Sequence, residues 1–196
     1  MAIGDIIVGM DIGTSKVSIV IGEVNNFNQI EVIYTDSQKC RGIKKGKIID
    51  EDEIVLAVTK LIKNAEIDAN LTINSTYITI PGKYVTIVQN SILKDAKDRY
   101  AGISMKDVSA SIMQVSDIDI PEGKQIIDIV TDRFILENGR IVQDPVGSLS
   151  SSFTLKAQII LADKEYIKKI TNILKRAYIE TVSYTHLRAH ETPEHL

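Results

Sequence analysis

The N-terminal part of the chain alternates between short apolar runs and polar connectors. Three runs rich in β-branched residues cover residues 6–12, 16–23 and 29–35, and short polar or glycine-bearing segments separate them. This pattern predicts an antiparallel meander of strands. Asp50 then precedes apolar residues at helical spacing, which predicts a helix that starts there. A further strand is expected over residues 76–80, so the block has the order β-β-β-α-β.

A second block begins at Lys83. Its apolar positions predict a strand over residues 84–93, a helix capped by Ser104, a strand over 125–136 and a last strand over 153–161. The order strand, helix, strand, strand differs from that of the first block. No internal repeat and no low-complexity segment interrupts either block.

Asp163 precedes one more helical pattern, in which Ile167, Ile170 and Leu174 share a face. This helix lies outside the second block, and we expect it to pack on the first. The second block, residues 83–162, is therefore interpreted as an insertion between a strand and a helix of the first block.

Composition places the chain among ordinary globular proteins. Its 196 residues carry 23 basic and 26 acidic side chains, a net charge of −3, and 44% of the residues are apolar. This balance argues against a disordered chain and against nucleic-acid binding driven by positive charge. The single cysteine, Cys40, excludes an internal disulfide, and no run approaches the ~18 apolar residues of a membrane helix. We therefore expect a cytoplasmic protein that does not insert itself into a membrane.

The last sixteen residues differ from the rest of the chain. Isoleucine occurs 34 times but never after Ile179, whereas the three histidines are His186, His190 and His195. Residues 181–196 also lack a strand or helix period. They could be a disordered tail, a metal-binding segment or a non-native sequence translated from adapter or vector DNA. We favour the third interpretation and expect this tail to pack against nothing.

The segment with the most chemistry is GMDIGTSK, at the turn between the first two predicted strands. A tight turn at Gly13 can aim several backbone N–H groups at one anion, and Thr14, Ser15 and Lys16 add two hydroxyls and a cation. Asp11 offers a hard oxygen for Mg²⁺, through a water molecule. Nucleotide phosphate with magnesium needs this set of groups.

Local pattern alone also allows a simpler explanation of that segment. Gly13, Thr14 and Ser15 fit an ordinary hairpin turn with Asp11 as a solvated strand end, because D-x-G-T also occurs by chance. The basic loop RGIKKGKIID likewise fits an anion patch or, as we favour, a solvated loop. No pattern in the chain predicts a catalytic residue.

The context of the hairpin favours the phosphate interpretation. The order β-β-β-α-β with DIGTSK in the first hairpin resembles the opening of the actin, Hsp70 and sugar-kinase ATPase fold, an α/β fold of the ribonuclease-H-like type. More specifically, VGMDIGTSKV, RGIKKGKIID, YITIPGKYV and DPVG occur in the order typical of the FtsA family of bacterial cell-division proteins. The resemblance spans nearly all of residues 6–180.

The resemblance implies a domain organisation. Residues 1–82 would be the first part of actin-like subdomain 1A, and residues 83–162 an inserted α+β strand-helix-strand-strand subdomain, called 1C or SHS2. Residues 163–180 would be the helix that returns to 1A, and 181–196 the non-native tail. Subdomain 1A would be incomplete in this chain.

The resemblance also implies a ligand. Asp11, Gly13, Thr14, Ser15 and Lys16 would surround the phosphates of ATP, with Asp11 facing the Mg²⁺ ion. FtsA-like proteins bind ATP in a cleft between two lobes. This chain stops at less than half the family's usual length, before a second phosphate loop and the other lobe. We therefore expect at most weak ATPase activity from the intact protein and none from this part of it.

The family's role implies several partners. FtsA-like proteins polymerise as actin-like filaments, anchor the tubulin-like FtsZ to the membrane and recruit later division proteins, and 1C contributes to self-association and recruitment. The intact protein would then lie in the cytoplasm, at the inner face of the cell membrane at the division site. Its membrane contact would come through a C-terminal amphipathic helix that this sequence does not contain. No nucleic-acid partner is expected.

Two other functions stay open. The actin-like PilM of type IV pilus assembly shares a similar first phosphate loop and a 1C-type subdomain, although the loop RGIKKGKIID favours the division protein. A sugar or acid kinase of the same superfamily would transfer a phosphoryl group to a small substrate. Such an enzyme needs a catalytic carboxylate in a substrate cleft, and the insertion at Lys83 offers no such cluster.

Overall fold

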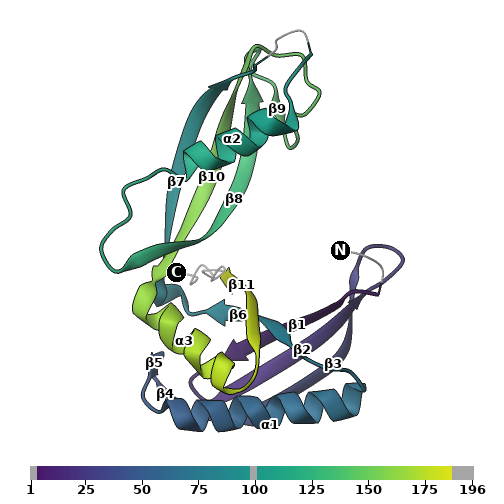
Figure 1. The fold of residues 1–196 in the computed structure, drawn as a ribbon, viewed down its shortest axis with the longest axis vertical. Helices are drawn as coiled ribbons and strands as arrows, with labels where there is room; N and C mark the ends of the chain where they lie inside the picture. The colour runs from purple at the N-terminus through teal and green to yellow at the C-terminus, as the bar shows by residue number, and fades with distance from the viewer. Residues whose placement is uncertain (1–3, 98–100, 187–196) are drawn as a thin grey trace, which may run out of the picture. The chain divides into compact units, whose positions relative to one another are not determined.

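The computed structural model describes residues 4–97 and 101–186, and the side chains of these residues up to 181. The chain forms two compact units (Figure 1): one combines Met1–Tyr84 with Glu165–Leu196, and the other is Val85–Lys164. The second unit begins and ends two residues later than the insertion expected from the sequence.

The first unit contains a five-stranded sheet in the order β11-β6-β1-β2-β3. As predicted, β1 (Ile6–Ile12), β2 (Lys16–Val24) and β3 (Ile30–Lys39) form an antiparallel meander. Strand β6 (Ser75–Ile80) lies parallel to β1, and β11 (Glu180–His186) lies parallel to β6. The parallel half of the sheet therefore depends on segments far apart in the sequence.

Strand β11 corrects one expectation. We expected residues 181–196 to pack against nothing, but Glu180 pairs with Ser75 and His186 pairs with Ile80. An open strand edge offers free N–H and C=O groups, which can pair with any extended segment whatever its side-chain pattern. The origin of the tail as foreign sequence stays a prediction, and His190 and His195 lie outside the described residues.

Two helices cover one face of this sheet. Helix α1 (Glu51–Ala69) begins where the sequence predicts, because the Asp50 carboxylate accepts a 3.0 Å hydrogen bond from the Glu53 N–H. Helix α3 (Lys164–Arg176) packs into the same core. The buried side chains that the two helices contribute are Ile54, Ala57, Val58, Leu61, Ile62, Ala65, Ile170, Ile173 and Leu174.

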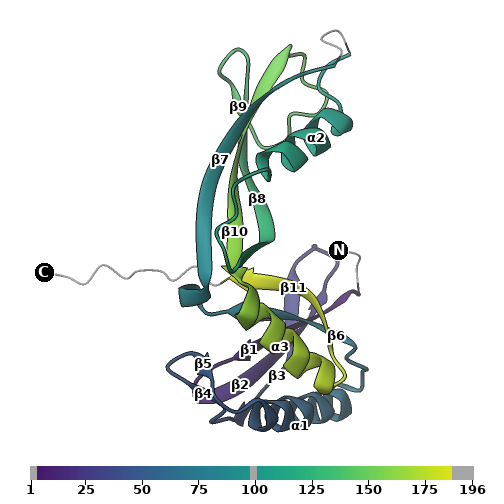
Figure 2. The same ribbon diagram turned by 60° about the vertical axis from the view of Figure 1, so that its left-hand side comes forward.

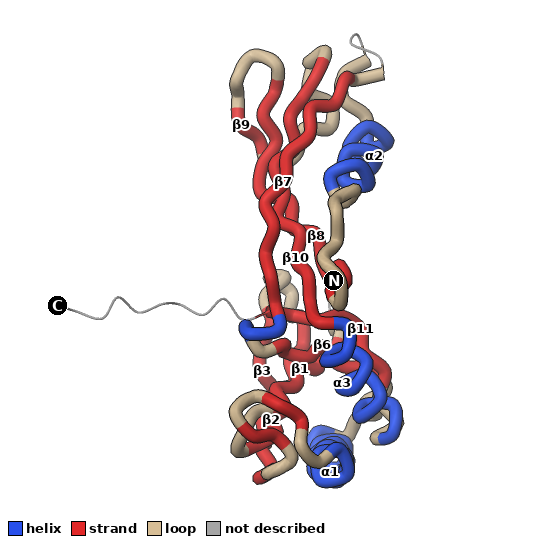
Figure 3. The backbone as a smooth tube through the Cα atoms, turned by 90° about the vertical axis from the view of Figure 1, so that its left-hand side faces the viewer, coloured by secondary structure: helices blue, strands red, loops and turns tan. Residues whose placement is uncertain are grey.

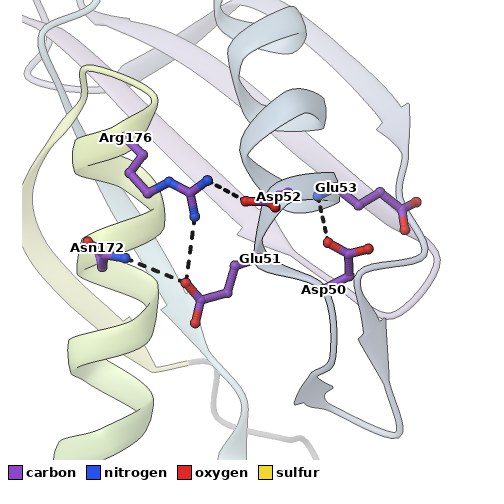
Figure 4. Close-up of polar contacts among 6 residues, drawn as sticks. All are labelled: Asp50, Glu51, Asp52, Glu53, Asn172 and Arg176. Carbon is purple, nitrogen blue, oxygen red and sulfur yellow. Dashed lines mark hydrogen bonds and ion pairs between the residues drawn. The ribbon is translucent and has the colours of Figure 1, made fainter.

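Polar contacts also join α1 to α3 (Figure 4). Arg176 forms an ion pair with Asp52 and lies 3.8 Å from Glu51, which also accepts a 3.5 Å hydrogen bond from Asn172. These side chains are largely exposed to solvent, so such pairs add little to the stability of the fold. Burying one large aliphatic side chain contributes about 1.5–3 kcal/mol, and the apolar core therefore dominates this helix pair.

The second unit is an antiparallel sheet with one helix on it (Figure 3). Its strand order is β7-β10-β8-β9, with β7 at Val85–Asp95, β10 at Ser152–Asp163, β8 at Lys124–Leu136 and β9 at Ile141–Val142. Helix α2 (Met105–Val115) covers one face. The predicted order strand, helix, strand, strand is confirmed, and the two-residue β9 is an addition that was too short to predict.

An aromatic pair lies in the core of the second unit. Phe134 of β8 and Phe153 of β10 have ring centroids 5.9 Å apart at an interplanar angle of 56°. Ile103, which precedes the N-cap of α2, and Val115, the last residue of α2, are buried in the same cluster. Within residues 85–97 and 101–164, only one face of the sheet carries a helix, as is common for antiparallel sheets.

A small hairpin and a short helical turn complete the first unit. Strands β4 (Ile43–Lys44) and β5 (Lys47–Ile48) pair antiparallel, and Gly82–Tyr84 forms a turn of 3₁₀-helix, η1. Lys45 and Gly46 both have positive φ, 49° and 70°, as a two-residue hairpin turn requires. Among the described residues, no helix is long and apolar enough to cross a membrane.

The N-terminus of α2 yields a prediction about stability and pH. The Ser104 hydroxyl accepts from the Asp107 N–H at 3.2 Å, and the Asp107 carboxylate accepts from the Ser104 N–H at 3.0 Å. Hydrogen bonds from Ser104 lower the pKa of Asp107. Replacing Ser104 by alanine should lower the free energy of unfolding of the second unit by about 1 kcal/mol at pH 7. The measurement is amide exchange of β8 and β10 in the whole chain.

The pH dependence has a definite sign. Because the pKa of Asp107 is lowered by folding, its stabilisation is present above its ordinary pKa of about 4 and is lost as the pH falls through the lower value. Asp107→Asn should remove this acid-dependent loss. Ser109→Ala, an exposed serine on the same helix, is the matched control. An equal cost for Ser104→Ala and Ser109→Ala would contradict the role of the cap.

Candidate functional site

The predicted phosphate residues lie together at the tip of the β1–β2 hairpin. The Gly13 N–H donates to the Lys16 carbonyl at 2.9 Å, which closes the turn. On the other side of the tip, the Ser15 carbonyl accepts from the Cys40 N–H at 3.1 Å. Thr14, Ser15 and Lys16 are exposed. Two backbone bonds therefore fix the tip, while its hydroxyls and its ammonium group face solvent.

Glycine at position 13 is favoured by one close contact and not by an unusual φ angle. A Cβ there would lie 3.2 Å from the Lys16 carbonyl oxygen and 3.5 Å from the Asp11 Oδ2 atom. The first contact is tight and would require a small shift at the closing hydrogen bond, whereas the second is an ordinary van der Waals contact.

Asp11 has a partner that sequence reasoning missed. The Thr79 hydroxyl of β6 donates a hydrogen bond to the Asp11 carboxylate. Gly9 pairs with Tyr77 and Met10 with Ile78, so the parallel register brings Thr79 beside Asp11. The two residues are 68 positions apart, and only the register of β1 and β6 could have indicated the contact.

The side chains at the candidate site could bind magnesium in one way only. No group of three or more acidic, histidine or cysteine side chains that could hold a metal ion occurs in the described part of the chain. Mg²⁺ keeps several waters and is commonly bound through one or two carboxylates and substrate phosphates. Asp11 alone therefore fits an ion that waters and phosphates complete, and does not fit a site made of protein ligands.

A hollow lies on the sheet face beside Asp11, opposite α1 and α3. Its volume is about 470 Å³, and it is lined by Ile7, Gly9, Met10, Asp11, Ser18, Ile19, Val20, Tyr77 and Thr79. The Ser18 hydroxyl is buried and has no hydrogen-bond partner within the described residues. The lining is apolar apart from Asp11, Ser18 and the Tyr77 and Thr79 hydroxyls. A triphosphate needs N–H groups and a cation, so the hairpin tip fits phosphates and this hollow does not.

A second cluster joins the basic loop to the turn after β6. Lys83 Nζ donates to the Lys45 carbonyl at 2.7 Å, and the Tyr84 hydroxyl donates to the Gly46 carbonyl at 2.9 Å. The Tyr84 ring stacks on the Tyr166 ring of α3, with centroids 4.0 Å apart. The two sequence segments RGIKKGKIID and YITIPGKYV therefore meet through backbone carbonyls, and the ring stack joins the second segment to α3.

The buried tyrosine of this cluster, Tyr166, is uncharged. Burial raises the pKa of Tyr166 well above its ordinary value, and the nearby Tyr84 and Asp11 raise it further. Tyr166 is therefore protonated throughout the physiological range. Lys44, Lys45 and Lys47 are exposed, and the loop contacts η1 through its carbonyl groups, which agrees with the favoured solvated-loop interpretation.

The fold and the hairpin together define a class of protein. The chain aligns with a solved chain of the PilM-PilN type IV pilus biogenesis complex at a TM-score of 0.59, over 92% of this chain and 47% of that chain. Their sequences are 12% identical, so this likeness shows the fold alone. The predicted α/β actin-like ATPase fold with an inserted SHS2 domain is confirmed.

Sequence comparison identifies the particular relatives. Residues 82–161 match the family described as the SHS2 domain inserted in FtsA. The chain is 24% identical over 177 residues to the cell division protein FtsA of Pseudomonas aeruginosa and 23% identical over 176 residues to that of Bacillus subtilis. Each match covers 90% of this chain. The predicted resemblance to FtsA, including its SHS2 domain, is therefore confirmed.

This chain spans less than half of those relatives. The matches cover 42% of the Pseudomonas aeruginosa protein and 40% of the Bacillus subtilis protein. The activity and the partners of a whole FtsA-like protein therefore do not follow from the comparison alone.

The contact between Tyr84 and Gly46 yields a prediction. Tyr84→Phe removes the hydroxyl that donates to Gly46 and keeps the ring that stacks on Tyr166, so the β4–β5 hairpin is held less firmly. A hydrogen bond of this kind contributes about 1 kcal/mol, so amide exchange of the hairpin should accelerate roughly fivefold. Tyr178→Phe is the control, because Tyr178 is 91% exposed. Unchanged exchange in Tyr84→Phe would contradict the assigned contact.

Proposed function

We propose that the β1–β2 hairpin binds the phosphates of ATP in the intact protein. The observation that supports this is the fixed, exposed tip at which Gly13, Thr14, Ser15 and Lys16 follow Asp11. In this proposal the backbone N–H groups of the tip, other than that of Gly13, bind phosphate oxygens, and the Lys16 ammonium offsets their charge.

Asp11 would have a positioning task in that site. The Thr79 hydroxyl holds its carboxylate at the end of β1. There the carboxylate can accept hydrogen bonds from waters around Mg²⁺, and the ion, when bound, neutralises phosphate charge. No general base is assigned to this chain. We accordingly expect at most weak ATPase activity from the intact protein and none from these 196 residues alone.

We further propose that the intact protein is a cell-division scaffold. The support is the SHS2 match over residues 82–161 together with FtsA relatives aligned over 90% of the chain. In this role the protein self-associates into filaments, links the FtsZ ring to the membrane and recruits later division proteins. It would lie in the cytoplasm at the inner face of the membrane at the division site, held by a C-terminal helix of the intact protein.

A PilM-like role in pilus assembly is the alternative. The observation in its favour is the structural match to the PilM-PilN complex over 92% of this chain. That match carries 12% identity, whereas the FtsA relatives reach 24%. The family match of residues 82–161 also names FtsA, so we place the division role first.

Nucleotide binding can be tested by calorimetric titration of ATP·Mg²⁺. The chain alone should bind no more tightly than about millimolar, because exposed ion contacts contribute only ~0–1 kcal/mol each. The intact protein, which adds further contacts to the nucleotide, should bind at least tenfold more tightly. In the intact protein, Asp11→Ala and Lys16→Ala should each weaken binding about tenfold.

Lys60→Ala provides the matched control, since Lys60 is an exposed lysine of α1 on the opposite side of the sheet from the hollow. It should leave the affinity unchanged. Equal affinities for the unmodified protein, Asp11→Ala and Lys16→Ala would remove the phosphate assignment. Micromolar binding by the chain alone would also contradict it.

The division role can be tested independently of the nucleotide. A fluorescent fusion of the intact protein should concentrate in a ring at midcell in dividing cells of its source. Depleting FtsZ should disperse that ring, because in the proposal the protein gathers at midcell by binding the FtsZ ring. Fluorescence at sites of pilus assembly with no midcell ring would instead favour the PilM-like alternative.

A further inference from the structure

The turn between β8 and β9 places an asparagine directly before a glycine (Figure 2). Glu137, Asn138, Gly139 and Arg140 connect the two strands, at the end of the second unit's sheet where β7 ends and β10 begins. All four residues are exposed. Of the nine asparagines in the chain, Asn138 is the only one that glycine follows.

Two backbone hydrogen bonds close this turn. The Gly139 N–H donates to the Leu136 carbonyl at 2.8 Å, and the Leu136 N–H donates to the Arg140 carbonyl at 2.9 Å. Gly139 has a φ of 81°, a conformation that glycine adopts without strain. The backbone of the turn therefore favours, directly after Asn138, the one residue that has no side chain to shield its nitrogen.

The Asn138 side chain is folded over the same turn. Its Oδ1 atom accepts a 3.0 Å hydrogen bond from the N–H of Arg140, two residues further on. An Asx turn of this kind curls the carboxamide forward along the chain, so its Cγ carbon lies on the side of the Gly139 peptide. A Cβ on Gly139 would meet no atom within 4 Å beyond the adjacent residues. A ring can therefore close here without displacing packed groups.

The strand that follows the turn is held weakly. Strand β9 has two residues, pairs with β8 at two positions, and has no second neighbour among the described strands. Short elements at the edge of a sheet open locally at a low cost in free energy. Each such opening frees the Gly139 nitrogen from its bond to Leu136.

The other asparagines lack this combination. Asn64 and Asn172 lie in the helices α1 and α3, and Asn90 lies in β7 with its side chain bonded to the Val115 carbonyl at 2.8 Å. The remaining asparagines precede residues that carry side chains. A Cβ on the following residue restricts the backbone angles that bring its nitrogen to the asparagine side chain.

From these observations we propose that Asn138 is a site of spontaneous deamidation in this protein. The Gly139 backbone nitrogen loses its proton to solvent and attacks the Asn138 Cγ carbon. A C–N bond forms there, and the bond from Cγ to Nδ2 breaks. The leaving NH₂ group takes up a proton and departs as ammonia, which leaves a succinimide ring between residues 138 and 139.

Water then opens the ring. It adds to one of the two imide carbonyl carbons, and the C–N bond at that carbon breaks. Opening at the former Cγ carbon leaves aspartate, whereas opening at the former backbone carbonyl leaves isoaspartate. Overall the chain releases ammonia and takes up one water molecule, and no atom is oxidised or reduced. The reaction does not depend on nucleotide binding or on the division role.

Isoaspartate would alter the far end of the sheet. It inserts one methylene carbon into the backbone after residue 138 and adds a carboxylate beside Glu137. The lengthened backbone no longer matches the hydrogen-bond spacing of the turn, so β9 should lose its pairing with β8. Val142 of β9 packs against the cluster that contains Phe134 and Leu136, and this part of the core would then lose its cover.

The test is peptide mass spectrometry of the whole chain during incubation at mildly alkaline pH, where more backbone nitrogens lose their protons. Deamidation replaces NH₂ by OH in the peptide that contains residue 138, and an isoaspartate methyltransferase labels the isoaspartate form. Asn138 should react at least tenfold faster than Asn26, an exposed asparagine that precedes phenylalanine. Amide exchange of β9 should be faster in the isoaspartate form than in the unmodified chain.

Two variants test the route of the reaction. Gly139→Ala adds a Cβ beside the attacking nitrogen and should slow the reaction at Asn138 at least tenfold, even where the strain of its positive φ loosens the turn. Asn138→Gln keeps an exposed amide but moves its carbonyl carbon one methylene further away, so it should abolish the fast reaction. Amide exchange in β10 confirms that both variants are folded.

Three results would overturn the proposal. One is an equal rate at Asn138 and Asn26, and another is a faster reaction at any other asparagine of the folded chain. The third is an unchanged rate at Asn138 in folded Gly139→Ala, which would show that the Gly139 nitrogen does not close the ring.

Discussion

The parallel pairing of β1, β6 and β11 is the constraint on which the first unit depends. Parallel neighbours need a crossover connection, and right-handed crossovers that run in one direction along a sheet place their helices on one face. Helices α1 and α3 obey this rule. The apolar residues on one face of the sheet are buried against these two helices. The second unit interrupts the crossover from β6 to β11 and returns the chain at the start of α3. An insertion there leaves the sheet and its core intact.

The same pairing builds the candidate phosphate site. The antiparallel hairpin fixes the tip from Gly13 to Lys16, and the parallel register of β6 brings Thr79 to Asp11. Neither contact stabilises the fold greatly, since the groups involved are largely exposed. Their effect is to hold polar groups in one place at the end of a buried strand. A binding site on a rigid edge of this kind loses little freedom when an anion binds.

The edge strands of the two sheets differ in the features that prevent pairing with another strand. Strand β3 carries charges and a register shift, while the open edge of β6 is covered by β11. Strand β7 has neither form of protection along most of its length.

The sequence by itself determined the helices, the longer strands up to β10 and the contiguous part of the candidate site. Hydrophobic period and caps at Asp50 and Ser104 predicted these elements, because such signals are local. The residues from Asp11 to Lys16 were predictable because they are contiguous. The bond from Thr79 to Asp11, the stack of Tyr84 on Tyr166 and the pairing of β11 were decided only by the tertiary structure. Each joins segments far apart in the chain, and sheet register and helix packing, which no local pattern encodes, bring them together.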